Sequence, residues 1–219
     1  MTDSDIVSAL TSNNTIEPTD LEFGYDIFIN VPEHLLRQWK NLLSLMVNQF
    51  LLFFERRKES QDLPPILFLL DEFPRLGKIP FIIDALATLR SKRISICLIM
   101  QSLAQLNMIY GANERKVIAD MCAYKAVLSA TDPETQEYFS KLIGTYDKEK
   151  KNHGVTSDSF IGIGRSRSVN TFTEEKRIIK PEGFATLRDI VFLHPFGAGF
   201  LRVEKVRIGG WGIRFVFVF

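Results

Sequence analysis

The chain has 219 residues, of which 46% are hydrophobic and 24% are charged, a composition typical of a soluble globular protein with one main domain. Its formal net charge of +1 excludes a global basic field that would attract nucleic acid, although a local basic patch is compatible with it. With two cysteines, three scattered histidines and no apolar run of about 18 residues, the sequence offers no disulfide framework, no metal-ligand spacing and no membrane-spanning segment.

The first part of the chain predicts a lead-in followed by one long helix. Residues 1–23 are expected to be mobile, because they are rich in Ser, Thr, Asn and Asp. Residues 25–30 form a short strand candidate. Pro32 then opens a helix over 35–54, whose narrow polar stripe indicates that most of its surface is buried. A membrane-surface helix is the alternative.

An unbroken apolar run from Ile66 to Leu70 ends in two carboxylates, Asp71 and Glu72. Such a run predicts a strand buried on both faces, as at the centre of a parallel sheet. Ligands of open parallel sheets bind beyond the carboxyl ends of the strands. Acidic residues at that place can hold a metal-bound nucleotide and activate a water molecule. The alternative is an acidic strand end that faces solvent.

Strand and helix alternate as far as residue 144, which is the pattern of βαβ units around a parallel sheet. The predicted elements are a helix at 81–91, a strand at 94–100, helices at 103–110 and 114–121 separated by Gly111, a strand at 124–129, and a helix capped by Asp132 and ended by Gly144. Gln101 follows the second strand and should reach the same edge as the acidic pair. An amide there can contact a γ-phosphate and the attacking water, or it can simply cap the strand.

Arg90 lies late in the helix between the two apolar strands. A guanidinium at this point can serve as an arginine finger for the nucleotide of a neighbouring subunit. The alternative is a cation that stabilises the C-terminal end of a helix.

The character of the sequence changes after residue 144. The segment from about 145 to 175 is rich in charged residues, Ser and Gly, and predicts a flexible surface loop. Its basic residues could touch DNA phosphates, although a solvated charged loop is the favoured alternative; they are Lys148, Lys150, Lys151, Arg165 and Arg167. Strands at 190–194 and 200–207 are expected to pair as a hairpin, and the apolar end at 213–219 must be packed.

No phosphate-binding G-x-x-x-x-G-K-[ST] pattern occurs in the chain. Gly77 and Lys78 lack the preceding glycine and the following Ser or Thr, and Gly162 and Gly164 lack the Lys. Because the glycine-rich loop and its lysine bind the phosphates in this class of site, the chain is expected to hold half of a nucleotide site at most.

Several segments resemble, in the same order, the type IV secretion coupling proteins, which are conjugative DNA-transfer ATPases of the TraG/TraD type. The segments are LFLLDEFPRLGKIP, ATLRSKRISICLIMQSLAQLNMIYG, SATDPETQEYFSKLIG, KRIIKPEGFATL and VFLHPFGAGFLRVEKVR. The resemblance covers residues 24–208. It implies an α/β fold with a RecA-like P-loop NTPase core, whose mostly parallel sheet is flanked by helices. This core is incomplete because it has no Walker A loop, and it ends in a C-terminal β-hairpin. Residues 24–219 are expected to be the C-terminal part of that ATPase domain.

The resemblance implies that Asp71, Glu72 and Gln101 contact ATP. Asp71 would be the Walker B carboxylate for Mg²⁺, Glu72 the catalytic base, Gln101 the sensor and Arg90 the arginine finger in trans. The parent protein would be a homohexamer on the cytoplasmic face of the bacterial inner membrane. It would move single-stranded DNA with its relaxase into the secretion channel, and its membrane anchor would lie outside this chain.

The chain alone is expected to be soluble and cytoplasmic, and neither to bind ATP tightly nor to hydrolyse it. The alternative function is a non-catalytic interaction module, or a truncated paralogue, that docks relaxosome proteins.

Overall fold

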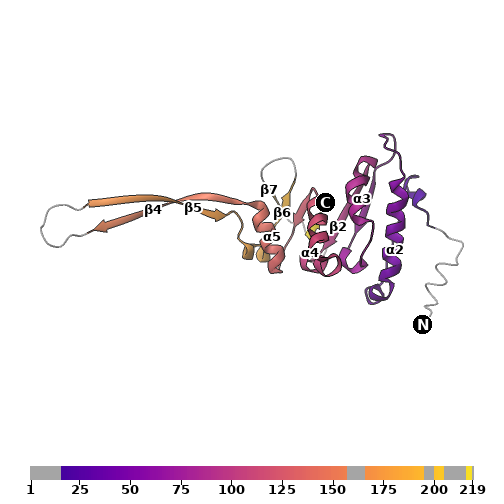
Figure 1. Ribbon diagram of the computed structural model, residues 1–219, viewed down its shortest axis with the longest axis horizontal. Helices are drawn as coiled ribbons and strands as arrows, with labels where there is room; N and C mark the ends of the chain where they lie inside the picture. Colours follow the sequence, from indigo (N-terminus) through magenta and orange to yellow (C-terminus); the bar gives the residue numbers. More distant parts are fainter. Residues whose placement is uncertain (1–15, 157–165, 195–199, 205–215, 219) are drawn as a thin grey trace.

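The computed structural model describes residues 16–156, 166–194, 200–204 and 216–218. They form an α/β body from which a long two-stranded ribbon projects (Figure 1). Of the helices in these ranges, none combines the length and the apolar character needed to cross a lipid bilayer.

The body is built on a six-stranded sheet with the order β1-β2-β8-β3-β6-β7. The strands are β1 (Ile66–Leu70), β2 (Ile94–Met100), β3 (Lys125–Val127), β6 (Asp189–Leu193), β7 (Phe200–Glu204) and β8 (Val216–Val218). β1 and β2 are parallel, and β8 is antiparallel to both of its neighbours, β2 and β3. β1, β2 and β3 therefore share one direction, as the alternation of strand and helix predicted.

The position of β8 makes the sheet mixed, with one parallel pairing and four antiparallel pairings among the described strands. The apolar chain end was expected to be packed, and β8 indeed has a ladder partner on each side. The predicted hairpin is also confirmed, since β6 pairs with β7 from Asp189 opposite Glu204 to Leu193 opposite Phe200. Its turn lies outside the described residues.

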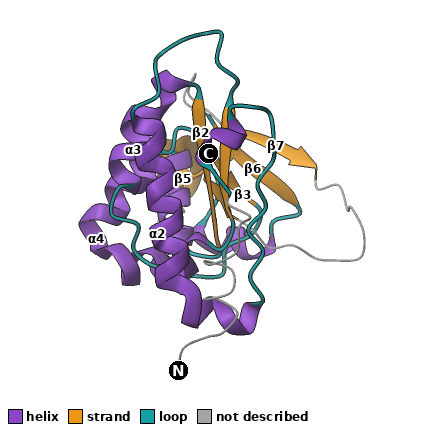
Figure 2. Cartoon of the chain, turned by 90° about the vertical axis from the view of Figure 1, so that its right-hand side faces the viewer, coloured by secondary structure: helices purple, strands orange, loops and turns teal. Residues whose placement is uncertain are grey.

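The main helices are α2 (Leu36–Glu55), α3 (Ile82–Thr88), α4 (Leu103–Met121) and α5 (Pro133–Ile143). Short 3₁₀ helices are η1 (Pro18–Leu21), η2 (Glu33–Leu35), η3 (Phe73–Leu76), η4 (Leu89–Lys92) and η5 (Pro181–Thr186). Figure 2 shows α2, α3 and α4 gathered on one side of the sheet. Local signals shape two of these helices. Gly111, with φ 76°, interrupts α4, and the Asp132 carboxylate accepts a hydrogen bond from the Thr135 N–H and so caps the start of α5.

The core lies between these helices and one face of the sheet. On β1, Ile66, Phe68 and Leu70 are buried, and the Phe68 ring packs on Phe54 of α2 at 5.9 Å between centroids. Leu67 and Leu69, on the other face, are 61% and 58% exposed. The prediction that β1 is buried on both faces is therefore wrong. An apolar run records the hydrophobicity of both faces, but burial also needs a second layer, which the described residues do not supply at β1.

The ribbon corrects a second expectation. Residues 145–175 were predicted to be a flexible loop, but β4 (Thr145–Thr156) and β5 (Ser166–Arg177) form a continuous antiparallel ladder. Residues 157–165, between the strands, lie outside the described ranges. Sequence patterns detect a strand by its apolar face, and this ribbon pairs mostly polar residues, so the pattern resembled that of a loop.

Part of the predicted lead-in lies among the described residues. Residues 1–15 lie outside the described ranges, but η1 follows them, and Glu22 forms an ion pair with Arg57 at 2.8 Å. Arg57 is a buried cation that needs a nearby carboxylate, and Glu22 supplies it. The mobility of residues 1–23 stays a prediction. The strand predicted at 25–30 has no ladder partner among the described strands.

Candidate functional site

The acidic pair and the amide meet at one edge of the sheet. β1 and β2 run parallel with Leu70 opposite Leu98, so both strands end at the same side. Gln101 Nε2 donates a hydrogen bond to Glu72 Oε1 at 2.9 Å. The expectation that two neighbouring strands deliver these side chains to one place is confirmed as geometry.

Glu72 has an unusual backbone. Its φ of 47° and ψ of 43° lie in the left-handed region, which is uncommon for a residue other than glycine. Such a conformation costs about 1–2 kcal/mol and tends to persist at functional sites. The Asp71 carboxylate supports it, because Asp71 Oδ1 accepts from the Glu72 N–H at 2.9 Å.

One carboxylate oxygen of Glu72 has no hydrogen-bond partner. Glu72 Oε2 is buried and unpaired among the described residues, while Oε1 is held by Gln101. A buried polar atom normally has a hydrogen-bond partner, so this oxygen is a place where a water molecule or another donor can bind. Gln101 holds the other oxygen of the carboxylate.

Asp71 is suited to hold a metal together with phosphate oxygens. Its carboxylate is exposed directly beyond β1. In nucleotide sites Mg²⁺ takes one or two carboxylates, and phosphates and water complete the coordination. The described residues contain no cluster of three or more His, Cys, Asp or Glu side chains that would hold an ion alone. The donors therefore fit Mg²⁺ bound to a nucleotide, but this chain supplies no glycine-rich loop for the phosphates.

Two side chains of α2 hold the loop that follows the acidic pair. Ser44 Oγ donates to the Lys78 carbonyl at 2.6 Å, and Asn48 Oδ1 accepts from the Phe81 N–H at 2.9 Å. Both residues belong to the narrow polar stripe of the helix predicted over residues 35–54, but the stripe by itself indicates no hydrogen-bond partner. Their one-turn spacing within an apolar helix is the available signal, because polar groups on a buried face need hydrogen bonds.

Tyr110 of α4 holds the same loop from the other side. Its hydroxyl accepts from the Ile79 N–H at 3.0 Å and donates to the Gly77 carbonyl at 3.4 Å, and its ring stacks on Phe73. Burial raises the pKa of Tyr110 to about 12, so the hydroxyl keeps its proton and can donate. The loop after Glu72 is thus fixed by three side chains from two helices.

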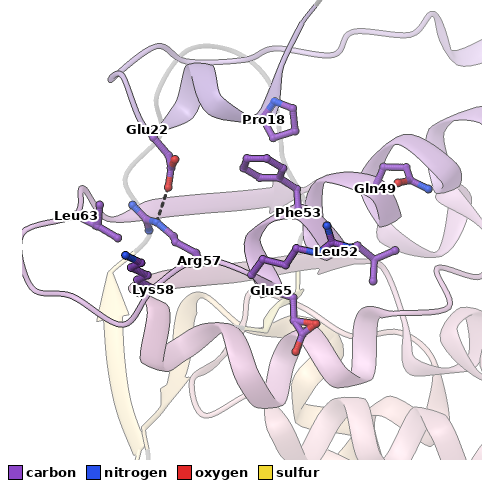
Figure 3. Close-up of a pocket in the computed structure, with 10 residues that line it drawn as sticks. Pro18, Glu22, Gln49, Leu52, Phe53, Glu55, Arg57, Lys58 and Leu63 are labelled. Carbon is purple, nitrogen blue, oxygen red and sulfur yellow. Dashed lines mark hydrogen bonds and ion pairs between the residues drawn. The ribbon is translucent and has the colours of Figure 1, made fainter.

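An apolar cleft leads to the acidic pair along the side of β1 that has no partner strand among the described residues. Its volume is about 340 Å³, and it is lined by β1, by α2 and by residues 27–31, with Asp71 and Glu72 at one end. A larger hollow of about 730 Å³ lies at the C-terminal end of α2, beside Leu52, Phe53 and Leu63 (Figure 3).

The larger hollow is separate from the acidic pair and lies beside a buried arginine. Arg57 beside it donates to Glu22 and to the carbonyls of Pro64 and Lys92. Those two carbonyls precede β1 and β2, so this hollow lies at the N-terminal ends of these strands, whereas Gln101 lies at their C-terminal ends.

Arg90 also lies near the N-terminal ends of the strands. It is exposed on η4, which precedes β2, whereas Gln101 follows β2. The 7 residues of β2 separate them, which corresponds to about 23 Å at about 3.3 Å per residue. Arg90 is therefore not brought to the acidic pair of its own chain, and its role toward a neighbouring subunit stays a prediction.

The five basic residues predicted to touch DNA do not form one described cluster. Lys148 and Lys150 lie on one face of the ribbon, where the Lys150 ammonium is 2.5 Å from Glu174. Lys151 has the opposite parity on β4. The side chains of Lys151 and Arg167, and the whole of Arg165, lie outside the described parts. Phosphate contact by these residues stays a prediction.

A family model described as the TraM recognition site of TraD and TraG matches residues 65–189, more than half of the chain. The VirD4 protein of Agrobacterium fabrum is 29% identical over 196 residues, which cover 84% of this chain and 29% of that protein. A VirD4 protein of Rhizobium rhizogenes is also 29% identical, over 92% of this chain and 30% of its own length. A probable conjugal transfer protein TraG of Sinorhizobium fredii is 27% identical over 83% of this chain and 28% of its own length. The chain therefore spans less than a third of these relatives.

Solved structures of the plasmid coupling protein TrwB share the fold. The complex with ADP and Mg²⁺ has a TM-score of 0.68 and 20% identity, covering 91% of this chain and 44% of TrwB. A trigonal form with sulphate has a TM-score of 0.69, also at 20% identity, covering 87% of this chain and 43% of TrwB. The predicted α/β fold class is confirmed. The expectation of a mostly parallel sheet is not met, because one pairing of the described sheet is parallel and four are antiparallel.

Proposed function

Because this chain belongs to the TraG/TraD family of type IV secretion coupling proteins, we propose that it supplies the acidic half of the ATPase site of a conjugative DNA-transfer motor. The observation that carries the proposal is the Gln101–Glu72 hydrogen bond beside a strained, partly unpaired Glu72. In a P-loop ATPase such an acidic strand end holds the metal and directs the attacking water.

Each residue has one role in this proposal. Asp71 would hold Mg²⁺, and the bound ion would supply charge neutralisation at the phosphates. Glu72 orients the attacking water and accepts its proton at the unpaired Oε2. Gln101 positions the Glu72 carboxylate and, through the same amide, responds to the γ-phosphate. Arg90 reaches the nucleotide of a neighbouring copy, at a site that its own chain cannot offer it.

In this proposal, the phosphate loop and the membrane anchor of the motor come from residues outside this chain. The glycine-rich phosphate loop comes from another part of the coupling protein, because the pattern is absent here. The motor is a homohexamer at the cytoplasmic face of the membrane, with its anchor outside these residues. It moves single-stranded DNA and relaxase toward the secretion channel. Two observations support this placement: the VirD4 and TraG likeness, and a TrwB neighbour that binds ADP and Mg²⁺.

A second candidate function is the docking of a relaxosome protein without catalysis. The observation that favours it is the description of the matching family model, which names a TraM recognition site. The two functions are compatible in one protein, but they need different residues. Docking does not require Glu72, whereas hydrolysis does.

The test joins this chain to a phosphate loop. Residues 24–219, which include α2, replace the matching segment of a VirD4-type relative, and ATP turnover is measured with single-stranded DNA present. Glu72→Gln should lower kcat about 10²- to 10⁴-fold, because it removes the general base. Glu114→Gln, which alters an exposed carboxylate paired with Lys78, is the matched control and should keep full turnover.

Two outcomes would overturn the proposal. One is a hybrid whose turnover survives Glu72→Gln. The other is ATP turnover by the purified 219-residue chain that Glu72→Gln abolishes, which would mean that no outside phosphate loop is required. A hybrid that binds a TraM-type protein equally well with and without the substitution, but never hydrolyses ATP, would support the docking function alone.

A further inference from the structure

The ribbon β4–β5 stands apart from the body in its architecture. Its 12-residue strands form a separate two-stranded sheet that projects away from the helices (Figure 1). At about 3.4 Å per residue the ribbon is about 40 Å long. An isolated two-stranded ribbon is marginally stable in water, so one of this length is best explained by a partner that covers it.

One face of the ribbon base is acidic. Directly opposed residues of an antiparallel pair share a face, and the register places Asp147 opposite Glu175, with Glu149 two residues further on the same side. All three carboxylates are exposed. Like charges placed directly opposite destabilise a ladder. Arg177 shares this face, but its guanidinium bonds to Glu137 of α5 at 2.9 Å and is already engaged.

The other face of the ribbon base is basic. It carries Lys148, Lys150 and Lys176 around a single carboxylate, Glu174. The ammonium of Lys150 is 2.5 Å from Glu174 and that of Lys176 is 3.7 Å away, so one carboxylate faces three cations. This face has an excess of positive charge, as the acidic face has an excess of negative charge.

We propose that the ribbon is a self-association arm whose acidic face docks on the basic face of the ribbon of a second copy. The charges on the two faces are opposite in sign, and their spacings along the strand are the same. Asp147 and Glu149 are separated by two residues, about 7 Å, and so are Lys148 and Lys150. Stacked ribbons therefore bring carboxylates and ammonium groups into register.

The contact joins two different surfaces, so it is heterologous and repeats from copy to copy. A ring or an open chain of subunits is the expected result, rather than a two-fold dimer. A nucleic-acid strand is the rival occupant of the lysines. It would cover the basic face and leave the opposed carboxylates of Asp147 and Glu175 uncompensated, whereas a second copy uses both faces.

The test is a charge swap on the full chain. One variant carries Lys148→Glu, Lys150→Glu and Lys176→Glu, and the other carries Asp147→Lys, Glu149→Lys and Glu175→Lys. Sedimentation velocity should show salt-sensitive association of the wild-type chain, since exposed charges are screened within about 10 Å at 0.1 M salt. Each variant alone should raise the apparent dissociation constant more than about tenfold, because both faces then carry one sign. An equimolar mixture of the two should restore association.

The controls separate this contact from general charge effects and from DNA binding. A variant with Arg37→Glu, Lys58→Glu and Lys116→Glu makes the same change in net charge as the lysine-reversed variant, at exposed positions away from the ribbon, and should associate normally. Amide exchange in β4 and β5 verifies that each swapped ribbon is still paired. The readout needs no nucleotide, so its result is independent of the hydrolysis test.

Two results would overturn the proposal. The first is a wild-type chain that stays monomeric at low salt while the lysine-reversed variant loses binding to an oligothymidine, which would assign the lysines to nucleic acid. The second is a mixture of intact, folded variants that fails to recover association.

Discussion

The β1–β2 pair of the sheet and the β4–β5 ribbon are both ladders of extended chain, yet they are stabilised in different ways. β1 and β2 place Ile66, Phe68 and Leu98 against helices, where burial removes apolar surface from water. The ribbon is a separate two-stranded sheet whose base carries exposed charges on both faces. The comparison teaches that similar backbone pairing is stabilised by apolar burial in the sheet and leaves charged faces exposed in the ribbon.

The same contrast explains where function gathers. The site at Glu72 needs a rigid support, because a left-handed carboxylate residue keeps its geometry only when the surrounding structure determines it. Three side chains from α2 and α4 fix the adjoining loop. In the proposed self-association, the exposed charges of the ribbon suit a contact that responds to salt.

The largest expected effect comes from breaking the buried side of the comparison. Phe54→Ala should lower the free energy of unfolding by about 3–5 kcal/mol, because the ring is fully buried against Phe68 and its removal leaves a cavity. Phe53→Ala, on the preceding residue of α2, is the control, since that ring is 40% exposed and its removal should cost much less. Urea unfolding followed by circular dichroism measures both. Equal losses for the two rings would contradict the layer arrangement.

A smaller effect is expected at the buried cation that joins the lead-in to the sheet. Arg57→Ala should cost about 2–4 kcal/mol, because it leaves Glu22 and the carbonyls of Pro64 and Lys92 without their donor. Arg56→Ala, on an exposed neighbour, should change stability by less than about 0.5 kcal/mol. Thermal unfolding compares the two variants. If Arg56 proved the more important residue, the placement of η1 against α2 would be wrong.

The smallest effect is expected at the junction between body and ribbon. Hydrogen bonds from Arg177, and then from Lys141, hold the pKa of Glu137 below its usual value. A lowered folded-state pKa means that the carboxylate contributes stability above its unfolded pKa of about 4.3, and this contribution is lost as the pH falls through the lower folded value. Glu137→Gln should therefore flatten the decline in melting temperature below about pH 4.3. Glu134→Gln, on the same helix, is a matched comparison that keeps the Arg177 contact. An unchanged acid profile for Glu137→Gln would show that this contact does not link ribbon and body.

Local sequence rules accounted for most elements of the body. The apolar runs ending at Asp71 and Gln101, the break at Gly111 and the stop at Gly144 all follow from patterns within a few residues. The same rules failed at the ribbon, because a polar strand has no apolar face to detect. They also assigned Ser44 and Asn48 to a polar stripe, although both residues bond to a loop more than 30 positions away.

By itself the sequence determined that two apolar strands would carry an acidic pair and an amide to one edge, since strand direction and side-chain order follow from the alternation of short periodic segments. Only the tertiary structure decided three other features. β8 lies between β2 and β3, β1 is buried on one face, and Ser44, Asn48 and Tyr110 fix the loop after Glu72. These features depend on contacts between distant parts of the chain, and burial and hydrogen bonding at such contacts are settled by packing rather than by local periodicity.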